Sequence, residues 1–206
     1  MRNKGRALLA LGLMLACVLG AGRSLAYTGR VIDGSTGKPA VGVYVIGRWE
    51  TGGGIVVPSS GCIVAVTQSD EKGEFTLRGG DGLLGTLFGP STRPAIFFYR
   101  RGYARTSTAV QKEDTFVVMP DPSATKARLA AILDLESKSQ CGSVEWQREK
   151  LIPLYRAIYE EAKDIAKEKD ELGFLDSAMA NIEVLELGYG VAVERSRERR
   201  RNWGLQ

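Results

Sequence analysis

The sequence predicts an α+β protein in which a seven-stranded Greek-key β-sandwich is followed by about three α-helices. About seven short runs rich in β-branched and aromatic residues, each bounded by turn formers, lie between Tyr27 and Met119. After Pro122 apolar residues recur at helical spacing instead. The 206 residues suffice for one moderate domain or two small ones. We therefore divide the chain into a leader at 1–26, a sandwich at 27–120, a helical segment at 121–194 and an Arg-rich tail at 195–206.

The N-terminal residues have the features of a secretory signal. A basic start precedes the uncharged apolar run at 7–22, and Ser24-Leu25-Ala26 fits a small-x-small cleavage site before Tyr27. That run is short for a membrane span, which needs about 20 residues. We therefore expect export to the periplasm or the medium. Lipidation at Cys17, which lies in a loose lipobox-like sequence, is the alternative and would anchor the protein to a membrane.

The positive formal charge of the chain comes from the leader. Four of the 28 Lys and Arg residues, and none of the 24 Asp and Glu residues, lie within 1–26. Without the leader the protein is formally neutral, so no overall field steers it to a polyanion. Nucleic acid is therefore not an expected partner.

Two cysteines, Cys62 and Cys141, are left after cleavage of the leader. In an oxidising compartment an even number of cysteines predicts a disulfide. This disulfide would close a loop of about 80 residues, for which chain entropy gives at most about 4 kcal/mol of stability. Two buried free thiols are the alternative.

The predicted sandwich opens with a strand–turn–strand signal. Extended-favouring residues at 30–32 and 41–46 flank turn formers at 33–39. Five further strands are expected at 62–67, 74–77, 95–99, 104–110 and 115–119. The run at 95–99 is apolar at nearly every position, which indicates a strand covered on both faces.

Two long loops, 50–61 and 79–94, interrupt the predicted strands. Binding sites tend to lie on loops that a rigid scaffold positions. These loops are therefore the hypothesised working surface of the sandwich.

The turn and core residues of the sandwich resemble those of a known family. The pattern consists of Gly29-x-Val31-x-Asp33, Thr36-Gly37-x-Pro39, Gly42-x-x-Val45, Thr67-x-x-Asp70-x-x-Gly73-x-Phe75 and Gly102-Tyr103. It is similar to the carboxypeptidase regulatory-like family, which has a transthyretin-like (prealbumin-like) sandwich. The resemblance covers residues 27 to about 119 and implies a non-catalytic module of an exported protein. The two long loops depart from the family pattern.

The first two helices are predicted from apolar stripes. One covers 124–136 and has Ser123 as a plausible N-cap. The other carries apolar residues from 151 to 166, with Lys and Glu on the opposite face. Pro153 lies inside this pattern, so the second helix either starts near Ile152 or kinks at the proline.

A third helix is expected from about Phe174 to Ala192. Its buried face carries apolar residues at helical spacing. Gly188 and Gly190 each cost roughly 1 kcal/mol in helix propensity. They indicate either close packing or local fraying near the end of this helix.

The chain contains no histidine, which excludes Ser-His-Asp and Cys-His catalysis and the commonest zinc sites. A carboxylate-only Ca²⁺ or Mg²⁺ site around Asp70, Glu71 and Glu74 is an alternative, but these residues lack EF-hand spacing, and a solvated β-turn is the favoured interpretation. Gly80-x-Gly82-x-x-Gly85 is followed by glycines and a proline rather than by a helix, so it predicts a loop. We therefore expect no enzymatic activity, no cofactor and no metal.

Two surfaces are candidates for contact with a partner. Trp49 lies at a strand end beside a Gly-rich loop, where it could contact a glycan, although sandwich aromatics usually fill the core. Arg195 and Arg199 belong to the Arg-rich tail, which ends near Trp203. The tail either contacts anionic lipid or an acidic partner, or it is a solubilising helix end.

These features together predict an exported, non-catalytic binding or structural module of the bacterial cell envelope. The expected partner is another envelope protein or a glycan, and a membrane only through lipidation or the Arg-rich tail. The alternative is a lipoprotein anchored through Cys17 that acts in complex assembly. A carbohydrate-binding protein or a hydrolase is a more distant alternative.

Overall fold

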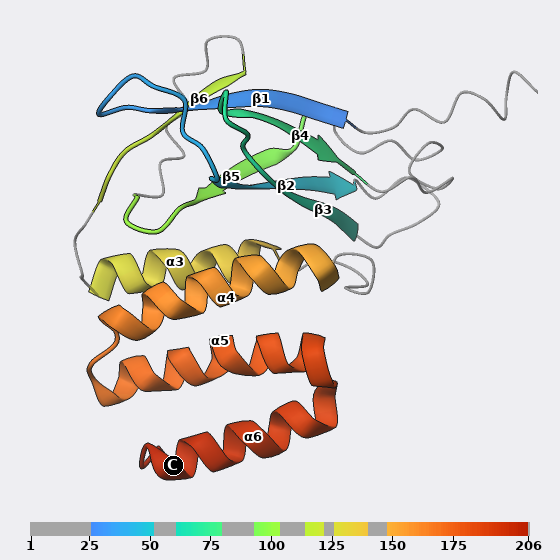
Figure 1. The fold of residues 1–206 in the computed structure, drawn as a ribbon. Helices are drawn as coiled ribbons and strands as arrows, with labels where there is room; N and C mark the ends of the chain where they lie inside the picture. The colour runs from blue at the N-terminus through green and yellow to red at the C-terminus, as the bar shows by residue number, and fades with distance from the viewer. Residues whose placement is uncertain are drawn as a thin grey trace, which may run out of the picture.

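A computed structural model describes residues 26–51, 61–79, 93–103, 114–121, 126–139 and 148–205 (Figure 1). These residues form six short strands and four helices. In chain order they are β1 (Ala26–Asp33), β2 (Tyr44–Thr51), β3 (Gly61–Gln68), β4 (Glu74–Arg78), β5 (Ala95–Tyr99), β6 (Thr115–Val118), α3 (Lys126–Ser139), α4 (Arg148–Ile165), α5 (Lys169–Leu187) and α6 (Tyr189–Asn202).

The strands form two three-stranded sheets, with the orders β4-β1-β6 and β3-β2-β5. β1 pairs antiparallel with β4 and parallel with β6, whereas β2 pairs antiparallel with both of its neighbours. The predicted seven-stranded Greek-key sandwich with three helices is therefore wrong, and only the α+β class is retained. The expected strand at 104–110 lies outside the described residues.

The opening strand–turn–strand signal does not form a hairpin, because β1 and β2 belong to different sheets. Asp33 Oδ1 accepts hydrogen bonds from Ser35 N at 2.9 Å and from its hydroxyl at 2.5 Å, which closes the turn onto β1. Ala40 N then donates to Val31 O at 3.0 Å, and the chain crosses to the second sheet. Turn-forming residues of this kind occur both in hairpins and in connections between sheets. The sequence alone therefore does not show which of the two connections forms here.

Two apolar cores result from the alternation of side chains along β2. Val45 and Trp49 face the interior between the sheets, where Phe75 and Phe98 also pack. Ile46 faces the other way and packs in a second core with leucines and isoleucines of α3 and α4. The sheet that contains β5 is therefore covered on both faces, as the apolar run at 95–99 predicts.

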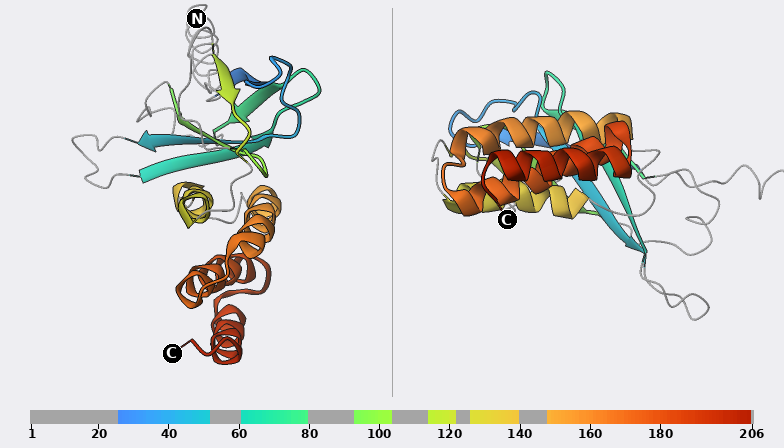
Figure 2. Two further views of the ribbon diagram at one scale, coloured as in Figure 1. Left: turned by 90° about the vertical axis from the view of Figure 1, so that its left-hand side faces the viewer. Right: turned by 90° about the horizontal axis from the view of Figure 1, so that it is seen from below.

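The helices form a stack beneath that sheet (Figures 1 and 2). α3 and α4 lie against it, α5 lies beyond them, and α6 is the outermost layer. Pro153 lies inside α4. The expected third helix is two helices, because Gly188 has a φ of 90° and ends α5 just before α6 begins. In the described ranges, no helix has both the length and the apolarity needed to cross a bilayer.

Candidate functional site on the C-terminal helix

α6 is a polar helix that is held on one side only. Within the described part of the chain, α5 is the only element with which it makes extended contact. Ala192 is the only fully buried residue of α6. Because so little apolar surface is buried, polar contacts must fix how α6 lies on α5.

Those contacts come from two carboxylates of α5, Asp176 and Glu183, which are each only 2% exposed. Arg199 of α6 donates from Nε to Asp176 Oδ1 at 2.9 Å and from Nη1 to Glu183 Oε1 at 2.7 Å. Ser196 Oγ donates to Asp176 Oδ2 at 2.7 Å. Burial opposes the charge on Arg199, but the hydrogen bonds to both carboxylates outweigh it and raise the pKa of Arg199. We call these four residues the α5–α6 seam.

Two more arginines lie at the edges of the seam. Arg195 Nη1 is 3.8 Å from Glu183 Oε1, and Arg200 Nη1 is 4.0 Å from Asp176 Oδ2. Three guanidinium groups therefore share two buried carboxylates. The two carboxylates therefore neutralise most of the positive charge of Arg195, Arg199 and Arg200.

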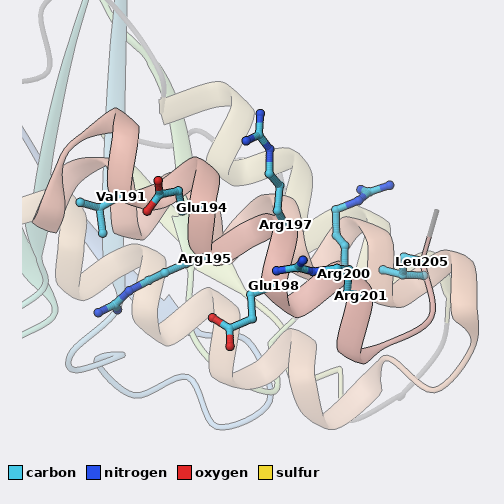
Figure 3. A pocket seen from close by; sticks show the side chains of 8 residues that line it. All are labelled: Val191, Glu194, Arg195, Arg197, Glu198, Arg200, Arg201 and Leu205. Carbon is cyan, nitrogen blue, oxygen red and sulfur yellow. The ribbon is translucent and has the colours of Figure 1, made fainter.

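The opposite side of α6 points away from the rest of the protein. Glu194, Arg197, Glu198 and Arg201 are exposed and lie three, four and seven residues apart, so they share one face. They line a shallow concave surface of about 850 Å³, together with Arg195, Arg200, Val191 and Leu205 (Figure 3). We call the four residues Glu194, Arg197, Glu198 and Arg201 the outer face of α6. Neither Arg197 nor Arg201 forms an ion pair with another described residue.

The structure separates the roles of the predicted tail residues. Arg199 lies in the seam, Arg195 lies at its edge, and both belong to a regular helix. Trp203 ends α6: its N–H donates to Arg199 O at 2.9 Å, and its half-buried side chain packs against the helical core. Trp203 is therefore part of the packing of the C-terminus and not an exposed membrane anchor.

Trp49 is not a surface residue. It is 1% exposed and packs in the core between the two sheets. The favoured interpretation of the sandwich aromatics as core residues is therefore confirmed for Trp49, and the alternative glycan contact is wrong because the ring is not accessible. Its place at a strand end suggested exposure, but β2 extends to Thr51 and keeps Trp49 within the sheet.

Cys62 lies on β3, where it is paired with Glu50 of β2. Cys141 and Cys17 lie outside the described residues, as do positions 52–60 and 80–92 of the two long loops. The disulfide, the lipidation and the loop surface therefore stay predictions. Counting free thiols in the denatured, non-reduced mature protein tests the disulfide: none is expected, and two would contradict it.

A buried cluster that the sequence did not predict joins the sandwich to the helices. Arg128 of α3 and Glu161 of α4 form an ion pair at 2.8 Å, with side chains 3% and 7% exposed. Arg128 also donates to Tyr103 O, and Gly102 N donates to Glu161 Oε1 at 3.2 Å. Tyr103 Oη in turn donates to Asp33 Oδ2 at 2.6 Å. We call these residues the Arg128 joint.

Asp33, which belongs to the Arg128 joint, and Tyr99, which lies outside it, each make polar contacts that help to hold this region together. The hydroxyls of Ser35 and Tyr103 lower the pKa of Asp33 to about 2, so this carboxylate is charged at neutral pH. Tyr99 Oη donates to Ala157 O of α4 at 2.7 Å. The sandwich and α4 are thus connected by polar contacts as well as by the apolar core.

A second unpredicted carboxyl group, that of Glu136 in α3, is 6% exposed. Its Oε1 accepts a hydrogen bond from Asn181 Nδ2 of α5 at 2.6 Å. Burial raises the pKa of Glu136 to about 7, and the hydrogen bond from Asn181 opposes this only in part. In the sequence, a buried charged residue of this kind can be recognised by its position within an apolar stripe. Glu161, which lies between Ile158 and Ile165, is an example.

The described residues contain no group of three or more His, Cys, Asp or Glu side chains able to hold a metal ion. At Asp70, Oδ1 instead accepts hydrogen bonds from Lys72 N at 2.9 Å and Glu74 N at 2.8 Å, which is the geometry of a turn.

No family model, curated protein or solved structure significantly matches the chain. The resemblance to the carboxypeptidase regulatory-like family therefore stays a prediction.

Proposed function

We propose that the protein is an exported, non-catalytic binding or structural module of the bacterial cell envelope that holds a protein partner through the outer face of α6. One observation carries the proposal: α6 packs on one side only and directs unpaired arginines away from the molecule. Interfaces between proteins are enriched in arginine. All five basic residues of α6 are arginines.

The rest of the fold supports this assignment. The Arg128 joint holds the sandwich and α4 together, and the seam holds α6 on α5. A rigid body that presents one helix at its far side suits assembly better than catalysis, because the polar clusters described are occupied by contacts within the chain. A glycan is less favoured as partner, because Trp49 is buried and no other aromatic residue lines the outer face.

The experiment is site-specific photo-crosslinking in the native envelope. A photoreactive residue is placed at Arg197 or at Arg201, both on the outer face, or at Lys38, on an exposed turn of the sandwich. We expect a discrete crosslinked protein from positions 197 and 201 and none from position 38. The product is identified by mass spectrometry.

The matched control is the charge-reversing variant Arg78→Glu, which changes an exposed residue of β4 by the same amount as Arg201→Glu changes α6. Arg78→Glu should leave the crosslink at position 197 unchanged, whereas Arg201→Glu should remove it. Absence of any crosslink from 197 and 201 would contradict the proposed function. Mass spectrometry of the mature N-terminus shows whether the exported form begins at Tyr27 or at an acylated Cys17.

A further inference from the structure

Six carboxyl groups among the described residues are more than nine-tenths buried. Five of them contact an arginine or accept at least two hydrogen bonds: Asp33, Glu161, Glu171, Asp176 and Glu183. The sixth is Glu136, which among these residues forms no ion pair and accepts one hydrogen bond, from Asn181 Nδ2 at 2.6 Å. A buried charge is costly unless it is paired and hydrogen-bonded. Glu136 is therefore the buried acid with the least support for its ionised form.

The groups that face Glu136 from the two neighbouring helices are neutral. Asn181 comes from α5, and Tyr155 comes from α4. Ser139 Oγ donates to Glu136 O at 2.7 Å and is hydrogen-bonded to Tyr155 Oη at 2.9 Å, so these hydroxyls bind the backbone and not the carboxyl group. Burial and the nearby Glu136 carboxylate raise the pKa of Tyr155 to about 12, which keeps this phenol neutral at physiological pH.

Charged side chains around this layer have partners or directions of their own. Lys138 and Asp134 lie two positions from Glu136 on α3 and therefore point to other sides of the helix. No lysine or arginine of the described residues contributes to the pKa of Glu136, which burial raises to about 7 against the hydrogen bond from Asn181. The buried and half-buried charged residues of α4, α5 and β2 are bound elsewhere: Glu161 to Arg128, Asp176 and Glu183 to Arg199, Glu186 to Arg156, Glu171 to backbone N–H groups and Arg48 to Glu50.

The two protonation states of Glu136 therefore favour different arrangements of the helices. The neutral acid can stay between α3 and α5 and accept the hydrogen bond from Asn181. The carboxylate needs water or a cation around it, and a side chain that is 6% exposed reaches little water while the helices are closed. Ionisation thus favours a small separation that hydrates Glu136.

The contact between α3 and α5 is where such a separation is easiest. These two helices touch over a short stretch, whereas α4 packs along both of them. The C-terminal end of α5 is also bound to α4, because Arg156 donates from Nε and Nη2 to Glu186 Oε1 at 2.9 and 2.6 Å. A displacement of α5 from α3 can therefore hydrate Glu136 while α5 remains on α4.

We infer that Glu136 and Asn181 form a pH-dependent contact between α3 and α5, which is closed when Glu136 is protonated and opens locally when Glu136 is ionised. The α5–α6 seam links the two outer helices through Arg199, so α6 moves together with α5 (Figure 1). The inference concerns contacts within one chain, and its test does not depend on the proposed partner.

Proton linkage gives the direction of the effect. A hydrated carboxyl group in the open form releases its proton near the ordinary pKa of 4.5, whereas the pKa of Glu136 in the closed form is about 7. Opening therefore becomes about tenfold more favourable per pH unit between these values and levels off above them. The contact is most stable at acidic pH.

The test is amide hydrogen–deuterium exchange of the mature protein at about pH 5 and about pH 8, corrected for the intrinsic pH dependence of exchange. Protection of the α5 amides around Asn181 should be at least about tenfold lower at the higher pH. Protection of β2 should change by less than about twofold, because the sandwich does not take part in the opening. An equal fall in all elements would indicate global destabilisation and overturn a local contact.

The variant Glu136→Gln stays neutral at every pH and keeps an acceptor for Asn181. Its α5 protection at about pH 8 should match that of the unaltered protein at about pH 5. The control Glu149→Gln removes an exposed carboxyl group of α4 and should retain the full pH dependence. Retention of that dependence in Glu136→Gln would overturn the inference.

A second measurement needs no altered fold. The carboxyl ¹³C resonance of Glu136 in the unaltered protein, assigned by its loss in Glu136→Gln, should titrate with a midpoint near 7. A midpoint near 4.5 would show that the carboxyl group is hydrated in the closed form, and it would equally overturn the pH-dependent contact.

Discussion

The Arg128 joint and the α5–α6 seam are both built from arginine and carboxylates, but they differ in balance and exposure. In the joint, one arginine meets one glutamate, and both side chains are less than a tenth exposed. In the seam, three arginines surround two buried carboxylates, and the side chains of Arg195 and Arg200 are 55% and 40% exposed. The joint is closed, whereas the seam opens onto the surface.

This difference indicates which cluster is structural and which can contact a partner. A closed pair far from water has its geometry fixed and offers no group to another molecule. The seam has three arginines for two carboxylates, and Arg195 and Arg200 at its outer edge are partly exposed. Its excess positive charge is therefore accessible to a partner. Whether an arginine can contact a partner therefore depends on where its charge is balanced, and not on the presence of arginine alone.

The largest expected effect is at the joint. Arg128→Met leaves the Glu161 carboxylate buried without its cation, and breaking such a pair typically costs 3–5 kcal/mol. We expect the free energy of unfolding, measured with urea, to fall by about that amount. An equal loss for Arg48→Met, which breaks an ion pair whose two side chains are 27% and 62% exposed, would contradict the distinction.

A double variant sharpens this result. Glu161 Oε2 has no hydrogen-bond partner among the described residues, so the joint is not fully satisfied. Replacing both partners, in Arg128→Met/Glu161→Leu, removes the charge together with its burial cost. The double variant should therefore recover most of the stability that Arg128→Met loses.

Glu136 extends the comparison to a buried carboxyl group without a cation. Its pKa is raised from 4.5 to about 7, so the folded protein holds a proton that the unfolded chain releases between these values. The burial cost is absent below pH 4.5, grows as pH rises and is complete above pH 7, where it is about 3 kcal/mol. Glu136→Gln should stabilise the protein by a similar amount at pH 8 and have little effect at pH 4. Equal effects at both pH values would contradict this assignment.

The sequence predicted the elements of the fold better than their connections. Strand-forming runs and apolar stripes locate most of the described strands and helices, because local burial periodicity is written into the residues. Sheet membership is not local: β1 and β2 are separated by an ordinary turn, yet they belong to different sheets. The sequence showed a glycine at position 188 but did not predict that the helix breaks there. The φ of 90° at Gly188 is a property of the folded chain.

The candidate site was predicted in part. The Arg-rich sequence indicated the region, but it did not separate Arg199, which the seam holds, from Arg197 and Arg201, which face outward. That separation depends on Asp176 and Glu183, which lie about 20 residues earlier on another helix. For Trp49 the sequence left a core role and surface exposure open, because exposure at a strand end depends on the neighbouring sheet and not on the sequence around it; the structure confirms the core role.

A substitution in the seam should lower the free energy of unfolding less than a substitution in the joint. Arg199→Met removes two charge-assisted hydrogen bonds, but Arg195 and Arg200 lie close enough to replace part of the lost charge. We expect a loss of about 2 kcal/mol in urea unfolding and faster amide exchange in α6. Arg197→Met, on the outer face, should stay within about 0.5 kcal/mol of the unaltered protein. Losses of the same size for both variants would mean that the seam does not hold α6.

The smallest effect concerns the turn that brings α6 back along α5. Gly188 has φ 90° and ψ 161°, a conformation that is nearly restricted to glycine, so Gly188→Ala should cost about 1 kcal/mol of stability. A Cβ at either Gly188 or Gly190 would meet no neighbouring atom within 4 Å, so steric clash does not distinguish the two positions. Gly190 lies within α6, where alanine is the better helix former, and Gly190→Ala should raise stability by roughly 0.5–1 kcal/mol. Thermal unfolding of the two variants should therefore give shifts of opposite sign. Shifts of the same sign would show that α5 and α6 do not need the break at Gly188 to form the seam.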